Sequence, residues 1–267
     1  MESGRTILIV GGGVVGSSIA YHLRLDGHTG RVVVIERDPT YTRASSSLAM
    51  GGIRQQFSSA VNVKLAQYST RFYTTFDRRM RVPSHTPKVN FRQRGYLFLV
   101  DDASADRFES RVERQRSIGA RVERLNLDQL RARMPDIRLD DIRFGVFGPH
   151  DGYLEPREVL AGFRAAASAT DVDYVTAEVV DLVMRSGQVE GVVLNSGERL
   201  MADAVVNAAG PFASRLAAMA GIHLPVEPVR QHLFRCALPE QWPYRFPMVI
   251  DPTGVHWRHD DASTIEA

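Results

Sequence analysis

Cysteine and lysine are scarce in this sequence. Cys236 is the only cysteine among 267 residues, so no internal disulfide can form and nothing indicates an oxidising compartment. We expect it to be a buried small apolar residue rather than a reactive thiol. Lys64 and Lys88 are the only lysines among the 33 Lys and Arg residues, and the remainder are arginine. A GC-rich genome is the simplest explanation, although the planar guanidinium group also suits carboxylate substrates.

Other absences exclude whole classes of partner. The formal net charge of +2 is too small to indicate nucleic acid or an anionic membrane surface. No apolar run approaches the roughly 18 residues of a membrane span, and the first residues resemble neither a signal peptide nor a presequence. We therefore expect a soluble, cytoplasmic protein. His256 and His259 lie three residues apart, but no third ligand accompanies them, so we expect no metal site.

The first 36 residues have the pattern of a parallel βαβ unit. Residues 6–10 form a short continuous apolar run, as expected for a strand buried on both faces. Residues 14–25 have the apolar spacing of a helix, and residues 31–35 form a second run rich in β-branched side chains. Residues 11–16, between the first strand and the helix, match G-x-G-x-x-G.

This glycine pattern is typical of a dinucleotide-binding turn. Gly11 permits the tight turn, Gly13 lets the backbone approach a pyrophosphate, and Gly16 lets the helix pack against the strand. The exposed N–H groups at the helix start favour phosphate. Glu36 lies 20 residues after Gly16, where a carboxylate accepts hydrogen bonds from the adenosine ribose. The alternative for the glycine pattern is a turn that binds no ligand, and the alternative for Glu36 is an ordinary surface acid. The pattern does not distinguish NAD from FAD.

The remaining sequence predicts alternating helices and strands, with a second domain inserted into the first. Asn126 is a good N-cap for a short helix, and Ser186-Gly187 and Ser196-Gly197 mark turns between strands. The expected helices cover residues 61–79, 103–118, 127–134, 156–169 and 212–220. The expected strands cover residues 95–100, 172–176, 179–184, 189–194 and 204–208.

Further segments follow one another along the chain in the order of a known family. They are Ala44–Ser47, the GGIRQQF segment Gly51–Phe57, the strand end Ala202–Pro211, Leu224–Gln231 and Asp251–Val255. Together they resemble FAD-dependent oxidoreductases of the D-amino-acid oxidase superfamily, in particular its sarcosine, dimethylglycine and glycine oxidase branch. The resemblance covers nearly the whole chain and is far more specific than the glycine pattern.

The resemblance implies an α/β fold with two domains and FAD as the cofactor, bound without a covalent link. A Rossmann-like FAD-binding domain would comprise residues 1–81 and 144–222. A smaller, sheet-containing α+β substrate domain would comprise residues 82–143 and 223–267.

The resemblance also implies the residues of the site. Arg54 should lie beside the isoalloxazine ring, where a fixed cation favours the anionic reduced flavin, and it is the one candidate catalytic residue. The alternative for Arg54 is a structural arginine, and for Val179 an ordinary strand residue. The residues expected to contact FAD are Gly11, Gly13, Val14, Val15, Gly16, Glu36, Arg37, Ser45, Ser46, Gly52, Arg54, Val179, Ala209 and Gly210.

The implied reaction is oxidation of a C–N bond in a small amino acid or N-methyl amino acid. A hydride equivalent passes to flavin N5, and water hydrolyses the imine product. Family members continue beyond the Asp251–Val255 segment, through a glycine-rich stretch that completes the flavin site. The sequence therefore leaves two further interpretations open: an inactive nucleotide-binding remnant, and one subunit of a split enzyme that a second chain completes.

Overall fold

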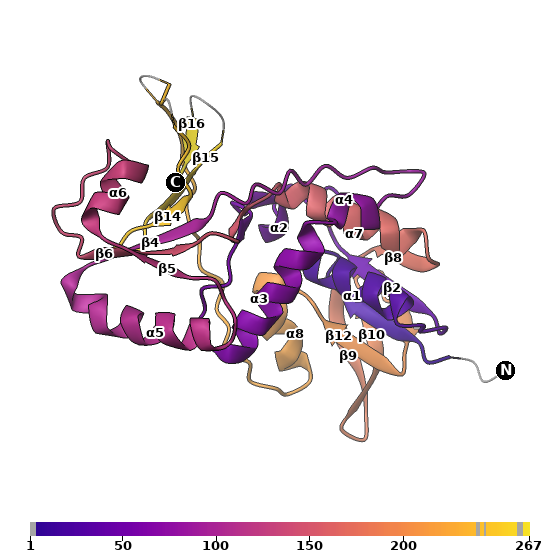
Figure 1. Ribbon diagram of the computed structural model, residues 1–267. Helices are drawn as coiled ribbons and strands as arrows, with labels where there is room; N and C mark the ends of the chain where they lie inside the picture. Colours follow the sequence, from indigo (N-terminus) through magenta and orange to yellow (C-terminus); the bar gives the residue numbers. More distant parts are fainter. Residues whose placement is uncertain (1–3, 239–240, 243, 261–263) are drawn as a thin grey trace. The chain divides into compact units, whose positions relative to one another are not determined.

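The computed structural model describes residues 4–238, 241–242, 244–260 and 264–267 (Figure 1). The α/β fold divides into two compact units. Unit 1 comprises residues 1–49, 77–89 and 156–230, and unit 2 comprises residues 50–76, 90–155 and 231–267. Residues 50–76 and 144–155 thus group with unit 2, and residues 82–89 and 223–230 with unit 1, which differs from the expected domain bounds. Which part binds FAD and which binds substrate stays a prediction.

Unit 1 is built on a parallel sheet. Its strands lie in the order β12-β1-β2-β8, with the bounds Ala204–Asn207 (β12), Ile7–Val10 (β1), Val32–Glu36 (β2) and Val172–Thr176 (β8). β1 pairs in parallel with both β2 and β12 over its whole length. Helix α1 covers Val14–Leu25, so the βαβ unit predicted for the first 36 residues is confirmed.

Both faces of this sheet are buried, as the continuous apolar strands require. One face packs on α1 and on α7 (Pro156–Ser168), which lie side by side, and its cluster consists of Ile9, Ala20, Val32, Val34, Ala167 and Val172. The other face contributes Leu8, Val10, Val33 and Ile35 to a cluster with Leu182, Val192, Leu194 and Leu216. The central sheet therefore lies between a helical layer and a second layer of mixed structure.

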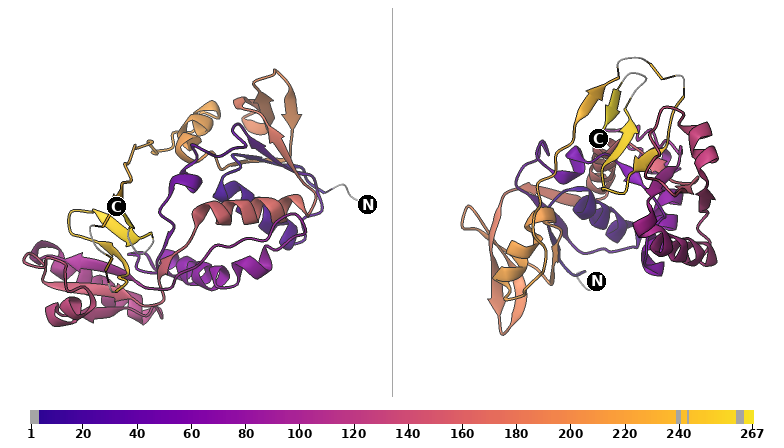
Figure 2. Two further views of the ribbon diagram at one scale, coloured as in Figure 1. Left: turned by 90° about the horizontal axis from the view of Figure 1, so that it is seen from above. Right: turned by 90° about the vertical axis from the view of Figure 1, so that its left-hand side faces the viewer.

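That second layer contains a small antiparallel sheet, seen as the salmon and orange strands in Figure 2. Its order is β11-β10-β9, with the bounds Arg199–Met201 (β11), Gln188–Leu194 (β10) and Val179–Arg185 (β9). Ser186 and Gly187 join β9 to β10 with φ of 49° and 79°, the left-handed pair that a tight hairpin prefers. Helix α8 (Ala213–Met219) follows the short 3₁₀ turn η2 (Gly210–Phe212) and packs against β9 and β12.

Unit 2 contains a larger mixed sheet in the order β13-β16-β15-β14-β4-β6-β5. The bounds of these strands, in that order, are Arg235–Ala237, Thr264–Glu266, His256–His259, Met248–Ile250, Tyr96–Val100, Phe144–Gly148 and Glu123–Leu125. β14 joins the sheet parallel to β4, so the yellow C-terminal strands lie beside a strand from the middle of the chain (Figures 1 and 2).

The two faces of β4 serve different clusters, because side chains alternate along a strand. Leu97 and Leu99 face a core with Leu125, Leu130, Met134, Phe147 and Phe246. Tyr96 on the opposite face packs with Met50, Tyr153 and Met248. Phe98 lies on this second face too, between that cluster and one under helix α5 (Ala105–Ser117), which the turn η1 (Asp102–Ser104) precedes.

The predicted helix over residues 61–79 is wrong in its length. α3 covers Ala60–Tyr73, and a separate turn, α4, covers Phe76–Arg79. The hydroxyl of Thr74 donates to the carbonyl of Arg71 at 2.8 Å, and that of Thr75 donates to the carbonyl of Phe72 at 3.2 Å. Such side-chain bonds compete with the helical pattern and end the helix between them.

Three further findings concern the scarce residues and absent segments. Cys236 is exposed in β13, so the expectation that it is buried is wrong. No described helix is both long and apolar enough to cross a bilayer. Among the residues placed by the structure, no group of three or more His, Cys, Asp and Glu side chains could hold a metal ion.

Candidate functional site

The glycine turn of unit 1 is shaped by close backbone approaches. Gly11 has φ of 103°, and a Cβ atom there would lie 2.3 Å from the carbonyl oxygen of Ala208. At Gly16 a Cβ atom would lie 1.9 Å from the carbonyl oxygen of Gly11. Neither position accepts a side chain, so both glycines are required by the fold itself.

Gly13 differs from its two neighbours in the pattern. It is the N-cap of α1, and a Cβ atom there would meet only the Ser46 hydroxyl, at 3.3 Å. Its glycine is therefore not required by packing. Apart from its own chain neighbours, no backbone atom lies within 4 Å of a Cβ atom at this position, and phosphates commonly bind at such a helix start.

Ser46 lies at that helix start. It belongs to the one-turn helix α2 (Ser45–Leu48), and its hydroxyl accepts a hydrogen bond from the N–H of Val14 at 3.0 Å. Arg157 of α7 donates from Nε to the carbonyl of Ser47 at 3.1 Å. The predicted residues Val14 and Ser46 are thus brought together, whereas the sequence shows Ser46 only as part of a Ser/Gly-rich loop.

Glu36 ends β2 with its carboxylate held by backbone donors. Oε2 accepts from the N–H of Gly12 at 2.8 Å, and Oε1 accepts from the N–H of Asp38 at 2.9 Å. Each carboxylate oxygen has a further lone pair available, so hydroxyl groups can still donate to it. The predicted ribose-binding acid is therefore fixed next to the glycine turn.

A cavity of about 340 Å³ in unit 1 is lined by Ile35 and Arg37, which flank Glu36 in sequence, and includes several predicted residues. Arg37 covers the ring of Phe212 with its guanidinium carbon 4.2 Å from the ring centroid, and it forms an ion pair with Glu178 at 3.6 Å. Apolar walls with two arginines, Arg37 and Arg215, suit a flat aromatic heterocycle. The lining residues are Val10, Ile35, Arg37, Ala177, Glu178, Val179, Val180, Ala209, Phe212, Arg215, Leu216 and Met219.

Three of the residues predicted to contact FAD line this cavity. Arg37, Val179 and Ala209 come from three separate segments and meet around this cavity, whereas Val15 is 59% exposed on α1. Gly210 adopts φ of 55° in the turn that leads to Phe212. Phe212 was missed, although its place directly after the Ala209-Gly210-Pro211 strand end could have indicated it.

The remaining predicted residues, Gly52 and Arg54, lie in unit 2. Gly52 and Ile53 form β3, which pairs antiparallel with β7 (Gly152–Tyr153). The guanidinium carbon of Arg54 lies 4.9, 5.6 and 5.3 Å from the ring centroids of Phe57, Tyr96 and Phe98. This is a cation held by aromatic faces, which lowers the cost of partly burying it.

Asp151 supports the segment that carries Arg54, and the sequence analysis missed it. Its side chain is 1% exposed; Oδ1 accepts from the N–H of Gln55 at 3.0 Å, and Oδ2 accepts from Nε2 of Gln56 at 3.3 Å. Burial raises the pKa of Asp151 to about 7, although these hydrogen bonds and the charge of Arg54 oppose the rise. In sequence, His150-Asp151-Gly152 has only the appearance of a turn.

Comparison with known proteins identifies the family. The family model described as FAD dependent oxidoreductase (DAO) matches residues 6–265. The chain belongs to this family. FAD is therefore the cofactor, and the residues of unit 1 fit it: a helix start at Gly13 with no backbone close to it, a fixed carboxylate at Glu36, and a cavity with apolar walls lined by Ile35 and Val179. The family resemblance inferred from the sequence is confirmed.

Relatives of this oxidoreductase domain include proteins of animals and bacteria. It is 32% identical to FAD-dependent oxidoreductase domain-containing protein 1 of Bos taurus, over 95% of this chain and 59% of the relative. It is 30% identical to glycine oxidase of Geobacillus kaustophilus, over 84% of this chain and 59% of the relative. The chain thus spans a little under three fifths of the length of these curated relatives.

A solved structure matches the whole oxidoreductase chain. L-proline dehydrogenase from P. horikoshii superposes with a TM-score of 0.82 and 25% sequence identity, over 100% of this chain and 70% of that one. The predicted fold class, with strands and helices arranged as in FAD-dependent oxidoreductases, is confirmed.

Proposed function

We propose that this oxidoreductase oxidises the C–N bond of a small amino acid or N-methyl amino acid. The observation that supports this most is the match of the entire chain to L-proline dehydrogenase, together with the 30% identity to glycine oxidase. Both names specify amino acids, and the two proteins share the architecture described above. The substrate class is carried over from these relatives.

In the proposed site, unit 1 binds the ADP half of the cofactor. The start of α1 around Gly13, together with Ser46, would hold the pyrophosphate, and Glu36 would accept hydrogen bonds from ribose hydroxyls. The cavity lined by Arg37, Val179 and Phe212 holds the adenine. The contacts to the ADP half are made by backbone donors, one carboxylate and apolar walls. They position the cofactor and take no part in the oxidation of the substrate.

Unit 2 contributes the charge that tunes the reaction. Bound FAD supplies the chemistry by accepting a hydride equivalent from the carbon next to the substrate nitrogen. Arg54 is the proposed flavin-side cation, and its three aromatic neighbours hold it in place. A fixed positive charge at Arg54 would stabilise the anionic reduced flavin and so favour hydride transfer to it.

The proposal is tested with the purified chain and a panel of electron donors. Acid precipitation should release all yellow colour to the supernatant, because the cofactor is bound without a covalent link. Glycine, sarcosine, dimethylglycine and proline should support reduction of an artificial dye, while simple alcohols and NADPH should not. Activity with alcohols or NADPH alone would contradict the proposed substrate class.

The proposal has two rivals, both of them interpretations that the sequence left open. A nucleotide-binding remnant would bind FAD but reduce no dye with any amine, whereas one subunit of a split enzyme would do so only after its partner is added. We place the active enzyme first, because the glycine turn of unit 1 holds the carboxylate of Glu36 and the start of α1 is bonded to Ser46. A cytoplasmic location stays a prediction.

A further inference from the structure

Unit 1 contains a cavity of about 320 Å³ that the proposed function leaves unused. It lies between the loop that follows β2 and helix α7, which packs against the one-turn helix α2. It shares no lining residue with the cavity proposed for the adenine. Small-molecule sites measure about 300 to 1,000 Å³, so a ligand can fit. The lining residues are Pro39, Thr40, Tyr41, Thr42, Ser47, Arg157, Leu160, Ala161 and Arg164.

Two arginines give this cavity a charge that no lining carboxylate balances. Arg157 and Arg164 are seven residues apart on α7, which places them on one face of the helix. Nε of Arg157 donates to the carbonyl of Ser47 at 3.1 Å, and its two terminal nitrogens have no partner among the described residues. The guanidinium carbon of Arg164 lies 5.5 Å from the ring centroids of both Tyr41 and Tyr174. Within the described part of the chain, neither arginine forms an ion pair.

The hydroxyl groups of the lining differ in whether they can bind a ligand. Asp38 is not a lining residue, and its Oδ1 accepts from the N–H of Thr40 at 3.0 Å and from the Thr40 hydroxyl. The Tyr41 hydroxyl is buried, out of reach of a ligand. The Thr42 hydroxyl contacts that of Thr40 at 3.3 Å, and the Ser47 hydroxyl has no partner among the residues that the structure describes. Two hydroxyl groups thus remain available beside the two arginines.

The backbone of the loop that lines the cavity is strained at Tyr41. Its φ is 55°, in the left-handed region that a residue with a Cβ atom rarely adopts. Tyr41 is 7% exposed, and its hydroxyl would lie 2.8 Å from a Cβ atom at Gly12. Packing next to the glycine turn therefore maintains an unfavourable conformation in the cavity wall. Strained residues that are kept in this way cluster at functional sites such as ligand sites.

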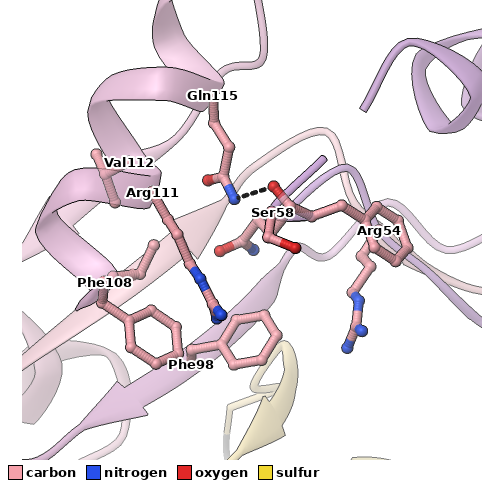
Figure 3. Close-up of a pocket in the computed structure, with 10 residues that line it drawn as sticks. Arg54, Ser58, Phe98, Phe108, Arg111, Val112 and Gln115 are labelled. Carbon is pink, nitrogen blue, oxygen red and sulfur yellow. Dashed lines mark hydrogen bonds between the residues drawn. The ribbon is translucent and has the colours of Figure 1, made fainter. Parts of the chain in front are cut away.

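A cavity in unit 2 also contains two arginines, but its surroundings differ (Figure 3). It measures about 140 Å³, and Arg54 and Arg111 line it together with the rings of Phe98 and Phe108. Among the described residues that line it, Ser58 alone carries a hydroxyl group. The cavity of unit 1 is larger and richer in hydroxyl groups, so it suits a strongly hydrated anion better.

We propose that the cavity beside α7 binds a small phosphate monoester, with the phosphate held by Arg157 and Arg164 and the organic group on the apolar wall around Leu160. A phosphate monoester carries about −1.5 to −2 charges near pH 7, which two arginines can balance. The planar guanidinium group forms paired hydrogen bonds with phosphate oxygens. The cavity is larger than a free phosphate requires. The inference is independent of the proposed function, because the oxidation uses no residue of this cavity.

The test uses phenyl phosphate, inorganic phosphate and phenol, with the chain saturated with FAD so that the pyrophosphate position is filled. In calorimetry, phenyl phosphate should bind at least tenfold more tightly than inorganic phosphate, and phenol should not bind. Arg157→Gln and Arg164→Gln should each weaken phenyl phosphate binding at least tenfold. Arg199→Gln is the matched control, because Arg199 is exposed on β11 of the same unit, outside both cavities, and it should change nothing.

Several results would overturn the assignment. They are undetectable binding of phenyl phosphate, equal binding of inorganic phosphate, release of FAD as phenyl phosphate is added, unchanged affinity in either cavity variant, and an equal loss in Arg199→Gln. Arg164→Lys guards against a folding defect: it keeps the charge but not the planar fork, so it should bind phenyl phosphate with intermediate affinity. The circular dichroism spectrum and the FAD content of each variant should match those of the unmodified chain.

Discussion

The three glycines of the turn differ in what surrounds them. Gly11 and Gly16 are fixed by backbone contacts that no Cβ atom could enter. At Gly13 a Cβ atom would meet only the Ser46 hydroxyl, at 3.3 Å, so we propose that its glycine serves the bound pyrophosphate. The G-x-G-x-x-G pattern predicts a glycine at each of the three positions. Only the structure shows that the physical reason for glycine differs between them.

Gly13→Val should therefore abolish FAD binding without unfolding the chain. The valine side chain fills the space that the pyrophosphate needs, and the start of α1 loses its ligand. We expect FAD affinity to fall at least a hundredfold in a fluorescence titration, with an unchanged circular dichroism spectrum. Leu25→Ala, at the exposed end of α1, is the control that should retain affinity. Retained FAD affinity in Gly13→Val would contradict the assigned site.

Asp151 should give the chain a distinctive pH dependence. Its folded pKa of about 7 lies above the unfolded value, so the folded state binds more protons between about pH 4 and 7. The free energy of unfolding should therefore fall as the pH rises through this window, by at most about 1.4 kcal/mol per pH unit from this group.

Urea unfolding of the unmodified chain and of Asp151→Asn measures this contribution. Asparagine cannot ionise, so the difference between the two free energies of unfolding should become smaller as the pH rises from 4 to 7. A difference that is constant over this range would show that Asp151 titrates normally. The Asp151→Asn substitution should also change the position of Arg54, because Asp151 accepts hydrogen bonds from the adjacent Gln55 and Gln56.

Among the secondary-structure elements, a helix was predicted correctly where an N-cap residue and the apolar spacing indicated the same start. α6 (Leu127–Arg133) begins behind Asn126, as predicted. Asn126 Oδ1 accepts from the N–H of Gln129 at 2.9 Å, and Gln129 Oε1 accepts from the N–H of Asn126 at 2.9 Å, which forms a capping box. By contrast, β6 is absent from the predicted strands, because Gly145 and Gly148 interrupt its apolar run.

Asn126→Ala should lower the free energy of unfolding by about 1 kcal/mol, the usual loss for an N-cap side chain. Arg131→Ala in the same helix removes only an exposed ion pair with Asp128 and should cost less than about 0.5 kcal/mol. Chemical denaturation of both variants makes the comparison. Equal losses in the two would mean that the cap contributes no more than the surface pair.

The whole molecule shows which parts of a fold can be predicted from local sequence. The parallel pair β1 and β2 of unit 1 was predictable, because both strands are largely apolar runs and α1 connects them. The sheet of unit 2 was not, because β14 pairs with β4 across about 150 residues and several strands have only three residues. Such short strands show no alternation, and long-range pairing leaves no local trace.

Contacts between residues distant in sequence also limited the prediction of the site. The residues of the ADP half lie in recognisable motifs, so they could be named in advance. Asp151 acquires its importance from Gln55, a neighbour that is distant in sequence. It does not lie in a motif that sequence reasoning could have selected.

The central claim is that the bound flavin is reduced by amino acids. Anaerobic titration of the purified, FAD-loaded chain with sarcosine, glycine or proline tests it most directly, with the visible absorbance of oxidised flavin as the signal. The account predicts complete bleaching by at least one of these compounds and none by the matching amine without a carboxylate. Flavin that binds tightly yet stays fully oxidised with every amino acid would contradict it.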